Sequence, residues 1–113
     1  MTRRTQRLAG RIATTLVALA LAGCEWAPLT REGEGVTLAR PEHVQNCRRL
    51  GEATAKVKSE VGGIARDPAT VAEELGNLAR NAAAGMGGDT VVPSGQPVWG
   101  EQRFTVYRCR QGR

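Results

Sequence analysis

Apolar and polar side chains alternate in three short stretches of the chain, a pattern typical of strands with one buried face. The stretches are residues 35–39, 50–61 and 103–110, and residues 89–92 are expected to form a further short strand. Pro41 ends the first stretch, and residues 41–45 are expected to form a turn or a single helical turn. Gly51 is a candidate β-bulge in the second stretch, and residues 62–63, both glycine, end it. We therefore expect four short strands.

One helix is predicted between the second and third strands. Asp67 suits the N-cap position and Pro68 the first helical position, while residues 87–88, both glycine, suit a left-handed C-terminal cap. Its expected apolar face is Val71, Leu75, Leu78, Ala79, Ala82 and Met86. Gly76 lies inside the helix and predicts close packing against a sheet. The order β-β-α-β-β predicts an α+β domain, in which a single helix covers one face of a small, mostly antiparallel sheet.

The first 23 residues have the organisation of a bacterial lipoprotein signal peptide. Four arginines (Arg3, Arg4, Arg7 and Arg11) precede an apolar run over residues 12–22. The run is shorter than the roughly 20 residues that a bilayer span needs. It ends at Leu21-Ala22-Gly23-Cys24, which has the form of a lipobox. We expect Cys24 to be the first mature residue and to carry a diacylglycerol and an N-acyl chain; an ordinary secretory signal is the alternative.

Residues 24–35 contain proline, glycine and several charges, and they predict a lipidated tether before a domain over residues 36–113. As a flexible coil, residues 25–35 would span about 15–20 Å. Trp26 and Leu29 are expected at the membrane interface. Glu25 replaces the aspartate that is associated with inner-membrane retention at this position. We therefore expect the protein on the periplasmic face of the outer membrane.

Removal of the signal peptide lowers the net positive charge of the chain. The whole chain carries 16 Lys+Arg and 11 Asp+Glu, but four of the basic residues lie in the signal. The mature chain of 90 residues then has 12 basic and 11 acidic residues, so its charge gives no support for nucleic-acid binding. Its length suits one small domain.

One of the three cysteines is expected to carry the lipid, and the other two are expected to bond to each other. With Cys24 lipidated, Cys47 and Cys109 form an even pair in an oxidising compartment, where a disulfide is expected. Two free thiols are the alternative. Because bonded cysteines need Cα atoms within about 7 Å, the strands that carry them should be antiparallel neighbours or near-neighbours.

That disulfide would gather four arginines at one end of the sheet as a candidate binding patch: Arg48, Arg49, Arg108 and Arg110. Strand alternation puts the last two on one face, while a bulge at Gly51 leaves the face of the first two open. Solvated charges at strand ends are the alternative interpretation.

No constellation of residues predicts catalysis or a metal site. His43 and Cys47 lie four residues apart, but there is no second histidine and the cysteine is expected in a disulfide. Neighbouring carboxylates at Glu73 and Glu74 point in different directions from a helix. We expect a non-enzymatic envelope lipoprotein that contacts a partner in surveillance or scaffolding, without metal or cofactor beyond the lipid on Cys24. The alternative is a ligand-binding or inhibitor module that captures an anionic envelope component or protein.

Three segments resemble a known family. They are Cys47-Arg48-Arg49-Leu50-Gly51-Glu52, then Leu78-Ala79-Arg80-Asn81-Ala82-Ala83 followed by glycines and Asp89-Thr90-Val91-Val92, and finally Val106-Tyr107-Arg108-Cys109. They are similar to small bacterial lipoproteins of the domain-of-unknown-function 4156 group, over most of residues 36–110. Where that family has Gly-Ala-Asn before the third strand, this chain has Gly87-Gly88-Asp89.

The architecture also resembles, more distantly, the outer-membrane sensor lipoprotein of the Rcs phosphorelay. That sensor has two disulfides and this chain can form only one, so the resemblance does not carry over the signalling role. The family implies a location and a fold, and no activity.

Overall fold

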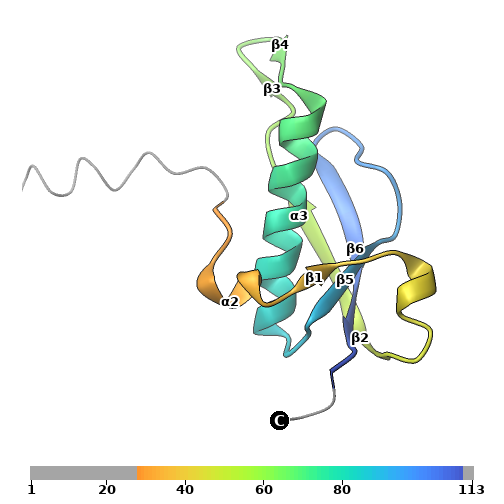
Figure 1. Ribbon diagram of the computed structural model, residues 1–113. Helices are drawn as coiled ribbons and strands as arrows, with labels where there is room; N and C mark the ends of the chain where they lie inside the picture. Colours follow the sequence, from red (N-terminus) through yellow and green to blue (C-terminus); the bar gives the residue numbers. More distant parts are fainter. Residues whose placement is uncertain (1–27, 111–113) are drawn as a thin grey trace, which may run out of the picture.

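The computed structural model describes residues 28–110, and Figure 1 shows the course of the chain. In order, the elements are α2 (Arg31–Glu34), β1 (Thr37–Leu38), the 3₁₀ helix η1 (Pro41–His43), β2 (Arg48–Lys56), β3 (Glu60–Val61), β4 (Ile64–Ala65), α3 (Pro68–Gly85), β5 (Thr90–Pro93) and β6 (Glu101–Arg108). The predicted signal peptide, Cys24 and Trp26 lie outside the described residues.

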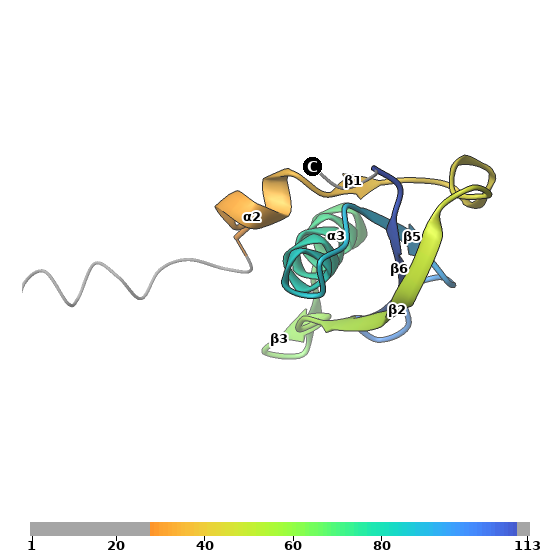
Figure 2. The ribbon, with the colours of Figure 1, turned by 90° about the horizontal axis from the view of Figure 1, so that it is seen from below.

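Four of the strands form one mixed sheet, in the order β1-β5-β6-β2. β1 pairs parallel with β5, whereas β5 with β6 and β2 with β6 are antiparallel pairs. Helix α3 lies along one face of this sheet, which curves around it (Figure 2). The predicted α+β class, with one main helix on a sheet ordered β-β-α-β-β, is confirmed.

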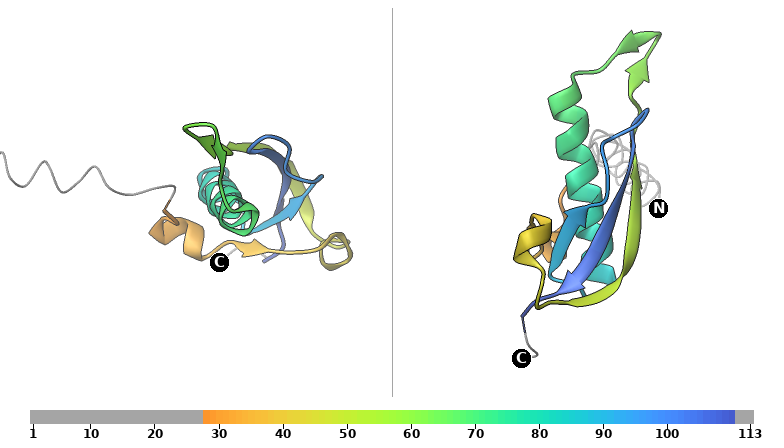
Figure 3. Two further views of the ribbon diagram at one scale, coloured as in Figure 1. Left: turned by 90° about the horizontal axis from the view of Figure 1, so that it is seen from above. Right: turned by 90° about the vertical axis from the view of Figure 1, so that its right-hand side faces the viewer.

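The second predicted strand is wrong in its extent. β2 ends at Lys56, and the rest of residues 50–61 turns into a separate hairpin in which β3 pairs with β4. Gly62 and Gly63 form its turn with φ of 60° and 79°, the positive values that a two-residue hairpin turn requires. The hairpin stands beyond the sheet, above the first turn of α3 (Figure 3).

Helix α3 begins as predicted. The Asp67 side chain accepts a hydrogen bond from the Thr70 N–H at 3.2 Å, and Pro68 follows the cap. The buried face is Val71, Leu75, Gly76, Ala79 and Ala83. Ala82 and Met86, both expected on this face, are exposed, because the four-residue steps from Val71 lead to Ala83. Adjacent alanines look alike in hydropathy, so the sequence did not distinguish them.

The core lies between α3 and the sheet. Its largest fully buried side chains are Leu75 of the helix and Val91, Phe104 and Val106 of β5 and β6. Burying each such side chain stabilises the fold by about 1.5–3 kcal/mol relative to exposure. This central packing fixes the position of the sheet end that carries the cysteines.

Residues 28–35 are folded against α3, so the expectation of a flexible coil is wrong for this part of the tether. The Asn81 Oδ1 atom accepts hydrogen bonds from Thr30 N–H at 2.8 Å and Thr30 Oγ1 at 3.0 Å. The Asn81 Nδ2 group donates to the Pro28 carbonyl at 2.8 Å. Leu29 is half-buried within this segment rather than free for a membrane. One amide side chain therefore satisfies polar groups that a coil would leave to water.

Candidate functional site at the disulfide end of the sheet

The predicted disulfide is present between Cys47 and Cys109, 62 residues apart in sequence, with Cα atoms 4.4 Å apart. β2 and β6, which the two cysteines adjoin, are antiparallel neighbours as expected. The bond joins the residue before β2 to the residue after β6. It therefore closes one end of the sheet covalently.

The arginines at this end fall on two faces of the sheet. Arg48 lies directly opposite Arg108 in the β2–β6 ladder, and Arg49 lies opposite Tyr107. The register shifts between Arg49 and Gly51, which confirms a bulge there. Residues opposite each other share a face, and Arg108 has the alternation of the buried Val106. Arg48 and Arg108 therefore project on the helix side, and Arg49 on the other.

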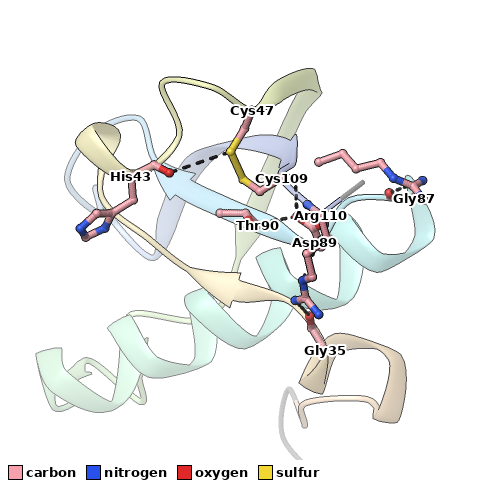
Figure 4. Close-up of polar contacts among 9 residues, drawn as sticks. Gly35, His43, Cys47, Gly87, Asp89, Thr90, Cys109 and Arg110 are labelled. Atoms are coloured by element: carbon pink, nitrogen blue, oxygen red, sulfur yellow. Dashed lines mark hydrogen bonds and ion pairs between the residues drawn. A yellow bond between two sulfur atoms is a disulfide. The ribbon is translucent and has the colours of Figure 1, made fainter. Parts of the chain in front are cut away.

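Arg49 and Arg110 already have acidic partners. The Arg49 guanidinium lies 3.7 Å from the Glu52 carboxylate. The Arg110 Nη2 group donates to the Gly35 carbonyl at 2.8 Å, and its Nε lies 3.9 Å from Asp89 Oδ2. Arg110 therefore serves to hold the segment before β1 against the end of the sheet (Figure 4).

The other two arginines are less engaged. Arg108 Nη1 donates to the Gly87 carbonyl at a long 3.4 Å, and no hydrogen bond or ion pair within residues 28–110 involves the side chain of Arg48. Both are exposed. A shallow pocket of about 720 Å³ lies beside Arg108, lined by Glu32, Ala84, Gly87, Gly88, Asp89, Arg108 and Arg110. Like charges directly opposite each other on neighbouring strands are unfavourable, so this pair would be stabilised by an anionic group.

Asp89 organises this end of the molecule, although no pattern in the sequence marks it as a site residue. Its Oδ1 accepts hydrogen bonds from the Cys109 N–H at 2.8 Å and from Thr90 Oγ1 at 2.9 Å. Its Oδ2 accepts from the Arg110 N–H at 2.8 Å. These contacts order the chain beyond β6 and hold Cys109 in place for the disulfide (Figure 4). The only signal in the sequence is an acidic residue between a glycine cap and a strand.

The ionisation of Asp89 reflects this environment. Burial of the carboxyl group raises its pKa, but the hydrogen bonds from Cys109, Arg110 and Thr90, together with the charge of Arg110, outweigh burial. The net effect holds the pKa of Asp89 below its ordinary value. The carboxylate is therefore charged at neutral pH.

His43 and Cys47 are not arranged as two ligands of one metal ion. The sulfur of Cys47 lies 3.9 Å from the carbonyl oxygen of His43, and a disulfide sulfur has no proton to donate, so this is a packing contact. The His43 ring is exposed. Across residues 28–110 no group of three or more His, Cys, Asp or Glu side chains could hold a metal ion.

Comparison with known proteins gives one match. Residues 27–109 match the profile of a family described as a domain of unknown function, DUF4156. No curated protein and no solved structure matches the chain, so the expected distant likeness to the Rcs sensor lipoprotein has no support. No helix of residues 28–110 is long and apolar enough to cross a membrane.

Proposed function

The chain belongs to the DUF4156 family, and we propose that it is a non-enzymatic lipoprotein of the bacterial envelope that contacts an acidic partner protein. The lipid is carried by Cys24 in the periplasmic face of the outer membrane. The contact is made by Arg48 and Arg108 at the disulfide end of the sheet. Surveillance or scaffolding of the envelope would use such a fixed binding surface.

The lipid anchor is supported by the lipobox and by the short distance from Cys24 to the folded segment. Cys24 and Pro28 are four positions apart in the sequence, which is at most about 14 Å of extended chain. Because Pro28 is held by Asn81 near the end of α3, the domain would stay close to the membrane. Incorporation of labelled palmitate tests this. Cys24→Ala should abolish labelling and release the protein in soluble form, and a wild-type chain without label would refute the anchor.

The single observation that carries the contact surface is the cross-strand pair of Arg48 and Arg108. Both side chains are exposed on one face, and their mutual repulsion is relieved by a carboxylate between them. The disulfide and Asp89 hold the strands under them in place. Because the strands are fixed, binding a carboxylate has to order only the two arginine side chains.

An alternative function uses Arg108 together with Arg110. The pocket of about 720 Å³ beside Arg108 and Arg110 favours a module that captures a small anionic group of an envelope component. Crosslinking in intact envelopes distinguishes the two. One dominant protein adduct supports a partner-contacting lipoprotein, whereas adducts of lipid or polysaccharide without protein support the capture module.

Arg48→Glu is the sharpest test of the surface. The new carboxylate would lie opposite Arg108 and form an ion pair with it, so crosslinking to an acidic partner should be lost while the melting temperature is unchanged or higher. The matched control is Arg49→Gln, which removes a charge from the opposite face and should leave crosslinking intact. Unchanged crosslinking in Arg48→Glu would mean that these arginines are only solvated charges at a strand end.

A further inference from the structure

The end of the domain opposite the disulfide displays a concentration of exposed apolar side chains. Among the described residues, six large apolar side chains are exposed, and four of them are at this end: Val61, Ile64, Val98 and Trp99. The first two are on the β3–β4 hairpin, and the others are in the connection between β5 and β6 (Figure 3). Trp99 is the most exposed, at 82%.

Trp99 lies in a tight turn, at a position where tryptophan is unfavourable for the stability of the fold. The N–H and carbonyl groups of Val98 and Glu101 bond to each other at 2.8 and 3.0 Å across a two-residue turn. The two central residues, Trp99 and Gly100, have φ of 52° and 74°, and asparagine or glycine is favoured at both places. A side chain on Gly100 would collide with the Val57 carbonyl, so the turn is fixed. An aromatic residue kept in this conformation indicates a function for its side chain.

The indole of Trp99 stands between two pockets. On one side is a pocket of about 520 Å³ that we call the polar pocket, because its lining includes Glu52, Gln96, Glu101, Gln102 and Arg103. On the other side is a pocket of about 510 Å³, formed with the hairpin and the first turn of α3. Trp99 lines both pockets, so a ligand in either one would contact the indole.

The polar pocket offers both hydrogen-bond donors and acceptors around an aromatic surface. The Gln102 Nε2 group donates to the Gly95 carbonyl at 2.8 Å, which leaves its side-chain oxygen as an acceptor. Two carboxylates and one guanidinium line the pocket. Without a surplus of positive charge, this lining does not favour phosphate or nucleic acid.

We propose that this end of the domain binds a neutral glycan chain, with one sugar ring stacked on Trp99. A pyranose ring has a face of C–H groups that packs on an aromatic ring and a rim of hydroxyl groups. The rim needs the mixture of donors and acceptors that the polar pocket supplies. The second pocket gives room for the neighbouring ring of the chain. This site is separate from the arginines at the disulfide end and does not depend on them.

Titration calorimetry on the purified full chain tests the proposal, with the tetramer of N-acetylglucosamine and with cellotetraose as ligands. Trp99→Asn keeps a residue that tolerates positive φ, so its melting temperature should be equal or higher. Its affinity should fall at least about tenfold, the loss expected when an aromatic contact worth about 1.4 kcal/mol is removed. Trp99→Tyr should bind within a few-fold of the wild type. Ile64→Ser, on the hairpin, is the matched control and should not change binding.

Other results overturn the proposal. No saturable heat with either saccharide refutes a glycan site. Equal loss of binding in Ile64→Ser and Trp99→Asn to an envelope protein, to neutral phospholipid vesicles or to a second copy of the chain would show that the apolar tip docks on one of these instead. If glycan binding is found, co-sedimentation with peptidoglycan sacculi and binding to the polysaccharide of lipopolysaccharide identify the source of the sugar.

Discussion

Asp89→Asn is predicted to destabilise the domain by about 2 kcal/mol. The carboxylate accepts three hydrogen bonds, two at Oδ1 and one at Oδ2. An asparagine that keeps its oxygen at the Oδ1 position turns its NH₂ group toward the Arg110 N–H, where two donors face each other. One hydrogen bond to a charged acceptor, worth about 1.5–3 kcal/mol, is lost. Because the Asp89 side chain is 17% exposed, water replaces it only in part.

Thermal unfolding followed by circular dichroism measures the effect. A loss of about 2 kcal/mol in a domain of this size lowers the melting temperature by about 10 °C. The matched control is Asp67→Asn, the same chemical change at the N-cap of α3, where asparagine and aspartate are equivalent. That variant should unfold within about 2 °C of the wild type.

The pH dependence provides a second measurement. Folding lowers the pKa of Asp89, so its stabilising contribution is complete above the unfolded value of about 3.9 and is lost as pH falls through the lower, folded value. The stability difference between wild type and Asp89→Asn should therefore be full at pH 7 and shrink below about pH 4. A variant as stable as the wild type at pH 7, or a difference that persists in acid, would refute this account of Asp89.

Three further changes have defined outcomes. Replacing Cys47 and Cys109 with serine opens a loop with a sequence separation of 62 and should reduce the free energy of unfolding in urea by about 4 kcal/mol; a loss below about 1 kcal/mol would contradict this. Gly76→Ala should raise stability by about 1 kcal/mol, since a Cβ there meets its nearest atom at an ordinary 3.9 Å, and a lower melting temperature would contradict that fit. Asn81→Ala should speed hydrogen exchange in residues 28–36 by at least about tenfold without the same change in the sheet, whereas Asn77→Ala, one turn earlier on α3, should not.

The sequence predicted those parts of the fold that depend on local chemistry. The start of α3 follows from Asp67 and Pro68, and the strands follow from short-range alternation. The hairpin after β2 was missed because alternating residues on either side of a glycine pair fit a continuous strand and a reversed one equally well. The docking of residues 28–35 was missed because it depends on Asn81, 51 residues from its partner Thr30, and nothing in the tether's composition indicates that contact.

The candidate site was predictable to a similar degree. The pairing of Cys47 with Cys109, and the arginines near them, followed from counting cysteines. The division of the arginines between two faces did not, because the face of Arg49 depends on which residue of β2 the bulge leaves unpaired. Asp89 was missed because its partners are the backbone N–H groups of residues 109–110, which look the same in every sequence.

The bulge at Leu50 also determines which face of the sheet each preceding side chain of β2 occupies. One unpaired residue reverses the alternation of side chains, so Arg48 shares a face with the core while Cys47 turns outward to meet Cys109. Deleting Leu50 would leave a regular ladder with Arg49 still opposite Tyr107 and Cys47 still on the outward side, so the disulfide would still form. A regular strand that kept every residue would instead turn Cys47 to the helix side, away from Cys109. Homologues in which β2 is one residue shorter at this place should therefore keep this cysteine pair, whereas those of equal length need the bulge to form it.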